Sequence, residues 1–316
     1  MAELGSRIAT RESYGHMLQE LGAENPDIVV LDADLSGSTK TAMFAQKFPD
    51  RFFDCGIAEG NMMAIAAGLA AAGKIPFASS FAMFATGRAY EQIRNSIGYP
   101  HLNVKIAASH AGITVGEDGA SHQCLEDIAL MRQIPGMVVM NPADDTEARR
   151  CVRAAVEHVG PVYIRLGRSA VPVVFDDSMK FEMGKGQILH EGTDVTLIAT
   201  GIMCDSAMQA TKALEAEGIS VELIDICTIK PIDREIIVNS ARKTGRVVTA
   251  EEHWTIGGLG SAVAEVLSED CPTRLCRIGI NDVFGQSGSA ADLMHFYQLD
   301  AEGVTNQVRA FVNRTR

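Results

Sequence analysis

The chain has 316 residues, enough for about two domains that each bury a core of their own. With 47% hydrophobic and 22% charged residues, it has the composition of a folded globular protein rather than of a disordered one. Its formal net charge of -12 argues against nonspecific binding to nucleic acid or to an anionic membrane surface, and no apolar run approaches membrane-spanning length.

The seven cysteines contain no C-x-x-C pair, and their number is odd. This pattern disfavours a zinc site or a disulfide framework and favours buried or inert thiols in a reducing compartment. Residues 1–11 carry no apolar core of the signal-peptide type. We therefore expect a cytoplasmic protein with no nucleic-acid or membrane partner and no metal ligands of its own.

Short apolar runs alternate with segments of helical composition, which predicts a parallel sheet covered by helices. In the first half, unbroken apolar runs predict strands buried on both faces. These strands are expected at 28–31, 75–78, 104–108, 137–140 and 162–164, and the helices at 10–21, 60–72, 90–97, 124–132 and 146–158.

The segment 169–192 interrupts this rhythm with a proline, two adjacent aspartates and scattered glycines. A second α/β series follows it. Strands are expected there at 195–199, 221–226, 247–250 and 275–278, and helices at 207–216, 235–241, 261–267 and 301–312. We predict an α/β protein of two domains, 1–180 and 181–316, each a mostly parallel sheet flanked by helices.

One carboxylate, Glu59, stands between a short apolar run and a helix of small residues, where an unpaired acid is costly. Glutamate is also common at helix N-termini, because the helix dipole favours negative charge there. Further along, Phe81 and Phe84 follow the end of a predicted strand. Such a pair is either core packing or, because ligands bind at the carboxyl ends of parallel strands, a platform for a flat heterocycle.

The segment 109–123 follows the next predicted strand and holds two histidines, two acids and three glycines. A loop of this length and polarity is unusual as a plain connection and common at functional sites. His110 and His122 are therefore candidates for catalysis or substrate binding, although a single histidine is more often structural.

Several segments of the first half resemble the pyrimidine-binding domain of transketolase, in that family's order and spacing. The second half resembles the transketolase C-terminal domain, so the resemblance covers almost the whole chain. A glutamate followed by a GEDG-x-x-HQ loop is a specific combination, whereas GGLG alone is weak. The segments are DADLSGS (32–38), DCGIAEGNM (54–62), FASSFAMF (77–84), SHAGITVGEDGASHQ (109–123), MRQIPGMVVMNPAD (131–144), YIRLGR (163–168), DVTLIATG (194–201), GISVELIDICTIKPID (218–233) and VVTAEEHWTIGGLG (247–260).

The resemblance implies a thiamine diphosphate enzyme in which Glu59 donates a hydrogen bond to the N1′ nitrogen of the cofactor's aminopyrimidine. Phe81 and Phe84 would pack against that ring, and Asp34 would approach a cofactor across the dimer interface. This role requires that no arginine of the chain already neutralises Glu59. An extra glycine, a departure from the family's pattern, leaves open which neighbour lines the ring: Gly87, Arg88 or Tyr90.

For the sugar substrate, the resemblance implies that Asp118 contacts a hydroxyl group and that His122 lies near the carbonyl oxygens of the donor. His110 falls at a position that binds the terminal phosphate. Ser38 and Arg168 match further phosphate positions, and a surface salt bridge is the alternative for Arg168.

Arg132 is an additional basic candidate, because arginine presents a bidentate fork to such an anion. Since a sulfonate has a similar oxygen geometry, a sulfo-sugar is not excluded.

The family's diphosphate-binding motif, a G-D-G followed by an asparagine, is not found in the chain. The chain therefore resembles the C-terminal subunit of a split transketolase. Such a subunit would be active only with an N-terminal subunit that binds the diphosphate and most of the Mg²⁺ or Ca²⁺. The resemblance implies a heterotetramer, homodimers without tight cofactor binding when the chain is alone, and transfer of a two-carbon ketol unit from a ketose phosphate to an aldose.

Three other functions stay open. The β subunit of a 2-oxo acid dehydrogenase shares this layout, and a deoxyxylulose phosphate synthase resembles the RAYEQ and MRQIP segments. A paralogue that only binds or regulates a partner is the third, although the intact acids and histidines argue against it. In the second half, His253 and Cys227 are interpreted as packing or interface groups, and the domain's expected role is subunit contact.

Overall fold

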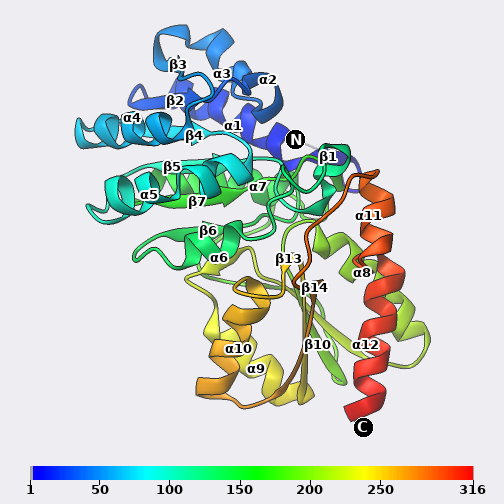
Figure 1. Cartoon of the computed structure of the whole chain (residues 1–316). Helices are drawn as coiled ribbons and strands as arrows, with labels where there is room; N and C mark the ends of the chain where they lie inside the picture. Colours follow the sequence, from blue (N-terminus) through cyan, green and yellow to red (C-terminus); the bar gives the residue numbers. More distant parts are fainter. Residues whose placement is uncertain (1–2, 316) are drawn as a thin grey trace.

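The computed structural model describes residues 3–315, and its two halves form two α/β units that pack against each other (Figure 1). Each unit consists of a mostly parallel sheet flanked by helices, which confirms the predicted fold class. Within residues 3–315, none of the helices combines the length and the apolar character needed to cross a membrane.

The first sheet has seven strands in the order β12-β6-β7-β5-β4-β2-β3, and only the β12–β6 pair is antiparallel. Strands β2, β5, β6 and β7 are buried along their whole length, as their unbroken apolar runs predicted. The edge strands β3 and β12 were not predicted. The strands are β2 (Ile28–Asp32), β3 (Phe52–Asp54), β4 (Ile75–Ser79), β5 (Lys105–Ala108), β6 (Val138–Met140), β7 (Val162–Arg165) and β12 (Thr228–Lys230).

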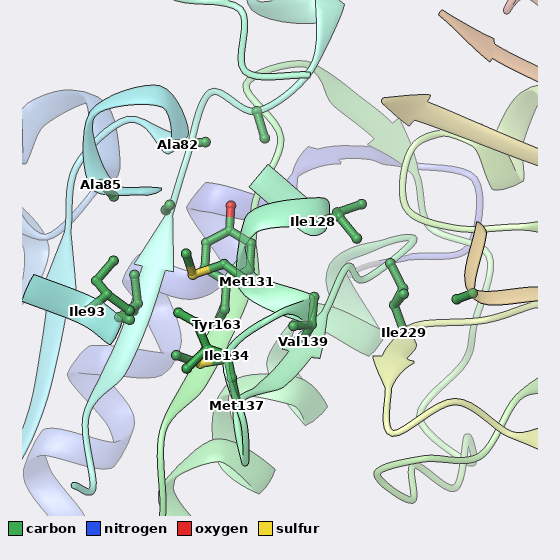
Figure 2. Close-up of a cluster of buried hydrophobic side chains, with 14 of the residues drawn as sticks. Ala82, Ala85, Ile93, Ile128, Met131, Ile134, Met137, Val139, Tyr163 and Ile229 are labelled. Carbon is green, nitrogen blue, oxygen red and sulfur yellow. The ribbon is translucent and has the colours of Figure 1, made fainter. Parts of the chain in front are cut away.

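Helices cover both faces of this sheet. On one face, α1 (Thr10–Glu24), α3 (Ala42–Lys47) and α7 (Asp145–Glu157) share an apolar core. On the other face, α4 (Glu59–Ala71) and α6 (Asp127–Arg132) pack over a second core, to which Ile229 of β12 also belongs. Figure 2 shows part of this second core, with Ile229 close to side chains of the first half. The unit also has short helical segments: α2 (Ser36–Thr39) and 3₁₀ segments at Pro49–Arg51 and Ile113–Asp118.

The segment expected as one helix at 90–97 is different in the structure. A single α turn, α5 (Tyr90–Gln92), lies between two π-helical turns, Met83–Arg88 and Ile93–Gly98. A π turn holds one more residue than an α turn, and such turns are frequent at functional sites. The first of them contains the extra glycine noted in the sequence, Gly87.

The second sheet has five strands in the order β14-β13-β10-β11-β9, with β9 antiparallel to its neighbour. The remaining helices flank it, and the small β1–β8 ribbon lies near the N-terminus (Figure 1). The strands of the second sheet are β9 (Gln187–His190), β10 (Val195–Ala199), β11 (Val221–Asp225), β13 (Arg246–Trp254) and β14 (Arg274–Ile280). The helices are α8 (Met203–Ala216), α9 (Arg234–Thr244), α10 (Leu259–Asp270), α11 (Ala290–Phe296) and α12 (Ala301–Thr315). The ribbon consists of β1 (Arg7–Ala9) and β8 (Ala170–Pro172).

Helix boundaries follow local side-chain chemistry. Asp144 and Asp233 accept hydrogen bonds from backbone N–H groups in the first turns of α7 and α9, which satisfies donors that have no partner inside the helix. Helix α9 ends at Gly245, whose φ of 67° is the left-handed conformation that glycine adopts without steric cost.

The two halves are joined by strand pairing as well as by the continuous chain. Strand β12 belongs to the second half in sequence but pairs with β6 of the first sheet. The domain boundary expected near residue 180 falls between β8 and β9 and stays a prediction. Within residues 3–315 all cysteines are free thiols; Cys151 and Cys227 are buried with their sulfur atoms 3.2 Å apart, and His253 is fully buried.

Candidate active site

Loops that carry most of the predicted site residues leave the first sheet at one edge. They follow the carboxyl ends of β2, β4, β5 and β7, which are parallel neighbours. An isolated bridge between Phe81 and Ser109 continues the β4–β5 pairing into two of these loops. Ligands of open α/β sheets bind at this edge. The fold therefore brings residues that are distant in sequence to one surface.

Glu59 is the first residue of α4 and is only 1% exposed. Its Oε2 atom accepts a hydrogen bond from Nη1 of Arg88 at 2.8 Å, and the Arg88 side chain is itself 52% exposed. The expectation that no arginine neutralises Glu59 is therefore wrong in this structure, and Glu59 is not free to serve a ring nitrogen while Arg88 holds it. The physical reason is the π-helical turn at Met83–Arg88, which packs against α4 and brings its last residue to the carboxylate.

Four aromatic side chains form a continuous row beside this ion pair. Phe81 stacks on His110 with ring centroids 3.8 Å apart, and the Phe81 and Phe84 rings are nearly parallel at 6.1 Å. His122 meets Phe84 edge-on at 5.1 Å. The Arg88 guanidinium lies over the Phe84 ring, 4.7 Å from its centroid, and so connects the row to Glu59.

His110 is the most buried polar group of the row. It is 3% exposed, and its Nδ1 atom shares a hydrogen bond of 2.9 Å with the Ser109 hydroxyl. Burial, and after it the charges of Arg11 and Arg168, lower the pKa of His110 from 6.5 to about 3. His110 is therefore a neutral imidazole at pH 7, able to donate or accept one hydrogen bond through each ring nitrogen.

Three basic residues, here called the basic cluster around His110, carry charges that act on this histidine, and two of them were missed in the sequence. Arg11 and Lys40 join the predicted Arg168 among the cations that act on the histidine. Arg11 donates from Nη1 to the Ser38 carbonyl at 2.8 Å, while its buried Nε atom has no hydrogen-bond partner. A signal for Arg11 was available: it lies in the first turn of α1, where the helix dipole disfavours a cation.

Arg168 is tied to the glycine-rich loop. Its Nη1 atom donates to the Val115 carbonyl and lies 3.3 Å from the Glu117 carboxylate and 4.0 Å from that of Asp118. Asp118 itself is exposed near the tip of the loop. The predicted hydroxyl contact and the predicted anion contact are thus neighbours.

Two predicted residues lie apart from this cluster. Arg132 donates to the Gly257 carbonyl at 2.7 Å and pairs with Glu265 at 2.7 Å, so its guanidinium is committed to the second half and is not carried into the proposed site. Asp34 is exposed with φ of 62°, and its backbone N–H donates to Asp54. The role expected for Asp34 at a dimer interface stays a prediction.

The arrangement fits a flat, nitrogen-containing ring. It presents two phenylalanine rings next to a buried carboxylate, which is the combination that an aminopyrimidine needs, provided that Arg88 leaves Glu59. The unpartnered Nε of Arg11, close to a neutral histidine, fits an anionic group. Over residues 3–315, no group of three or more His, Cys, Asp or Glu side chains is placed to hold a metal ion.

Comparisons with known proteins identify the family of both halves. The family model "Transketolase, pyrimidine binding domain" matches residues 6–174, and "Transketolase, C-terminal domain" matches residues 184–304. A solved structure described as the inactive β4 tetramer of a split-gene transketolase has a TM-score of 0.91 and 59% sequence identity, covering 98% of this chain and all of that one.

Two curated relatives match along nearly their whole length. A 6-deoxy-6-sulfo-D-fructose transketolase subunit from a Clostridium species is 43% identical, with 96% of this chain and 94% of the relative covered. One of the subunits of an apulose-4-phosphate transketolase from Phocaeicola vulgatus is 40% identical, with 97% and 98% covered.

Proposed function

This chain belongs to the transketolase family, and on that premise we propose that it is the C-terminal subunit of a two-chain transketolase dependent on thiamine diphosphate. The reaction is transfer of a two-carbon ketol unit from a ketose phosphate or sulfonate to an aldose. The observation that carries the proposal is the buried Glu59 next to the Phe81–Phe84 platform, at the same sheet edge as the basic cluster around His110.

Thiamine diphosphate supplies a thiazolium ring that stabilises a carbanion, the hard step of ketol transfer. Glu59 is assigned the hydrogen bond to a ring nitrogen, because it is the buried acid beside the platform. To do so it must exchange its hydrogen bond to Arg88 for one to the ring. The Arg88 side chain is half exposed, so it can move toward solvent, but this move breaks its hydrogen bond to Glu59 and its contact with the Phe84 ring.

We assign the terminal phosphate or sulfonate of the donor ketose to the basic cluster around His110. Arg11 has a buried N–H without a partner, and Ser38 and Arg168 border the same region. A neutral His110 adds a hydrogen-bond donor without adding charge. In this proposal Asp118 contacts a sugar hydroxyl and His122 approaches the donor's carbonyl oxygens. Phosphate and sulfonate share the oxygen geometry that this cluster recognises.

A partner chain completes the site in this proposal. The relatives named as subunits, and the split-gene tetramer that is inactive as β4, favour an N-terminal subunit that holds the diphosphate and a Mg²⁺ or Ca²⁺ ion. We place the assembly in the cytoplasm as a heterotetramer, with Asp34 facing a cofactor across the interface.

The test is reconstitution. Each chain alone and an equimolar mixture are given thiamine diphosphate, Mg²⁺, ribose 5-phosphate, and either xylulose 5-phosphate or 6-deoxy-6-sulfo-D-fructose as donor. Ketol transfer by the mixture and by neither chain alone supports the proposal, and the preferred donor identifies the anion. A mixture that binds thiamine diphosphate but decarboxylates 2-oxo acids instead would overturn it.

A further inference from the structure

Two adjacent glutamates on β13 accept hydrogen bonds from different halves of the molecule. Glu251, fully buried, accepts hydrogen bonds from the backbone N–H groups of Leu259 at 2.7 Å and Gly260 at 2.8 Å, at the start of α10. Glu252, 3% exposed, points the other way, since successive side chains of a strand alternate between its faces. Its Oε1 atom accepts a hydrogen bond of 2.6 Å from the backbone N–H of Thr114, in the glycine-rich loop of the first half.

The loop backbone is shaped around this carboxylate. Gly112 has φ of 84°, and a Cβ atom there would lie 2.2 Å from the carboxyl carbon of Glu252. Only glycine allows the backbone this conformation and this approach. Oε2 of Glu252 faces Arg165 at 3.8 Å, and the Glu252 carbonyl accepts from Nη2 of Arg165 at 2.8 Å. The carboxylate is therefore held in place from both sides.

The far end of the loop is held from the second half as well. Gln123 donates from Nε2 to two carbonyls of the loop and, at 2.9 Å, to the carbonyl of Gln286 in the segment after β14. A Cβ atom at Gly119 would lie 2.5 Å from Oγ of Ser287. Both ends of the loop thus contact the C-terminal half.

The loop needs such support. His110 adopts φ of 57°, a left-handed conformation that costs a non-glycine residue about 1 kcal/mol or more and persists only where surrounding contacts hold it. Thr114 is four positions further along, and between them lies Gly112, in contact with Glu252.

We propose that Glu252 is a positioning residue for the reaction: it fixes the backbone of the glycine-rich loop, and with it the substrate contacts of His110 and Asp118. This inference rests on the proposed function and gives the C-terminal half a role in the active site beyond subunit contact. A displacement of about 1 Å in such contacts can cost about 10²-fold in rate.

The test compares three variants in complex with the partner subunit. Glu252→Gln keeps an oxygen acceptor for the Thr114 N–H, whereas Glu252→Met keeps the volume and removes the acceptor. Glu251→Met is the matched control, because it removes an equally buried carboxylate that also accepts backbone N–H bonds but belongs to α10. The measurements are kcat and KM for the donor, hydrogen–deuterium exchange of residues 110–124, and the midpoint of thermal unfolding.

We expect Glu252→Met to lower kcat/KM by about 10²-fold, mainly through KM, and to speed exchange of the loop. Glu252→Gln should have a kcat/KM and a rate of loop exchange close to those of the wild type. Glu251→Met should lower the unfolding midpoint as much as Glu252→Met does, without changing KM or loop exchange. Unchanged loop exchange in Glu252→Met, or an equal rise of KM in both Met variants, would overturn the proposal. If the wild-type complex transfers no ketol unit, the proposed function fails, while the exchange data still decide whether Glu252 positions the loop.

Discussion

At the scale of single residues, the Glu59–Arg88 pair is the most consequential contact. Removing one partner of a buried carboxylate pair leaves an acid without a counterion. Because Arg88 is half exposed and water screens the pair, we expect Arg88→Met to lower the free energy of unfolding by about 1–2 kcal/mol. A double-mutant cycle with Glu59→Gln, followed by urea denaturation, should show that the two changes are not additive.

The control for this cycle is Lys74→Met, which breaks the exposed Lys74–Asp27 pair and should cost less than about 1 kcal/mol. Additive effects of the Glu59 and Arg88 substitutions would mean that the pair contributes nothing to stability, and that Arg88 does not compete for the acid.

His110 gives the protein a defined sensitivity to acid. Its pKa is about 3 in the folded chain and near 6.5 when unfolded, so between these pH values the unfolded chain binds one more proton. Stability therefore falls as the pH drops below about 6.5. Asparagine does not titrate, so the free energy of unfolding of His110→Asn should fall less than that of the wild type between about pH 7 and about pH 4.5. We expect urea unfolding to show a difference on the order of 2 kcal/mol between the two decreases. An identical loss in both proteins would show that His110 is not held neutral.

At the scale of elements, one lysine adds to the attachment of β12 to the first unit, beside its pairing with β6. Nζ of Lys230 donates to the carbonyls of Arg132 at 2.7 Å and Ile134 at 2.6 Å, at the C-terminal end of α6, where a cation also complements the helix dipole. Lys230→Met should reduce the free energy of unfolding by about 1–3 kcal/mol, since two carbonyls lose their donor. Lys185→Met, at an exposed ion pair, is the control; equal losses from both would contradict this assignment.

The central strands could be predicted from the sequence because each is a continuous apolar run that is buried on both faces. Strand β12 could not, because its three residues, Thr228–Lys230, become a strand only by pairing with β6 of the other half. The position of Glu59 at the start of α4 was also predictable. Its pairing with Arg88 was not, since it depends on a π-helical turn whose packing no local pattern shows.

At the scale of the whole molecule, the two halves should unfold together. Strand β12 completes the first sheet, and Ile229 packs in a core cluster that includes residues of both halves. Arg165 bridges Asp127 of the first half at 2.8 Å and Glu252 of the second at 3.8 Å. Separating the units would expose these groups, so we expect one cooperative transition in differential scanning calorimetry. Two resolved transitions would show that the units are energetically independent.

The candidate active site lies at the edge of the first unit, and the glycine-rich loop beside it contacts the second unit. We propose above all that Glu59 is the acid of a thiamine diphosphate site. The most direct measurement is the turnover of ketol transfer by the reconstituted complex with wild-type chain or Glu59→Gln, at saturating thiamine diphosphate and with calorimetric binding of the cofactor as the check on folding. The account predicts that Glu59→Gln binds the cofactor and loses turnover by about 10²-fold or more. Turnover close to that of the wild type would contradict it.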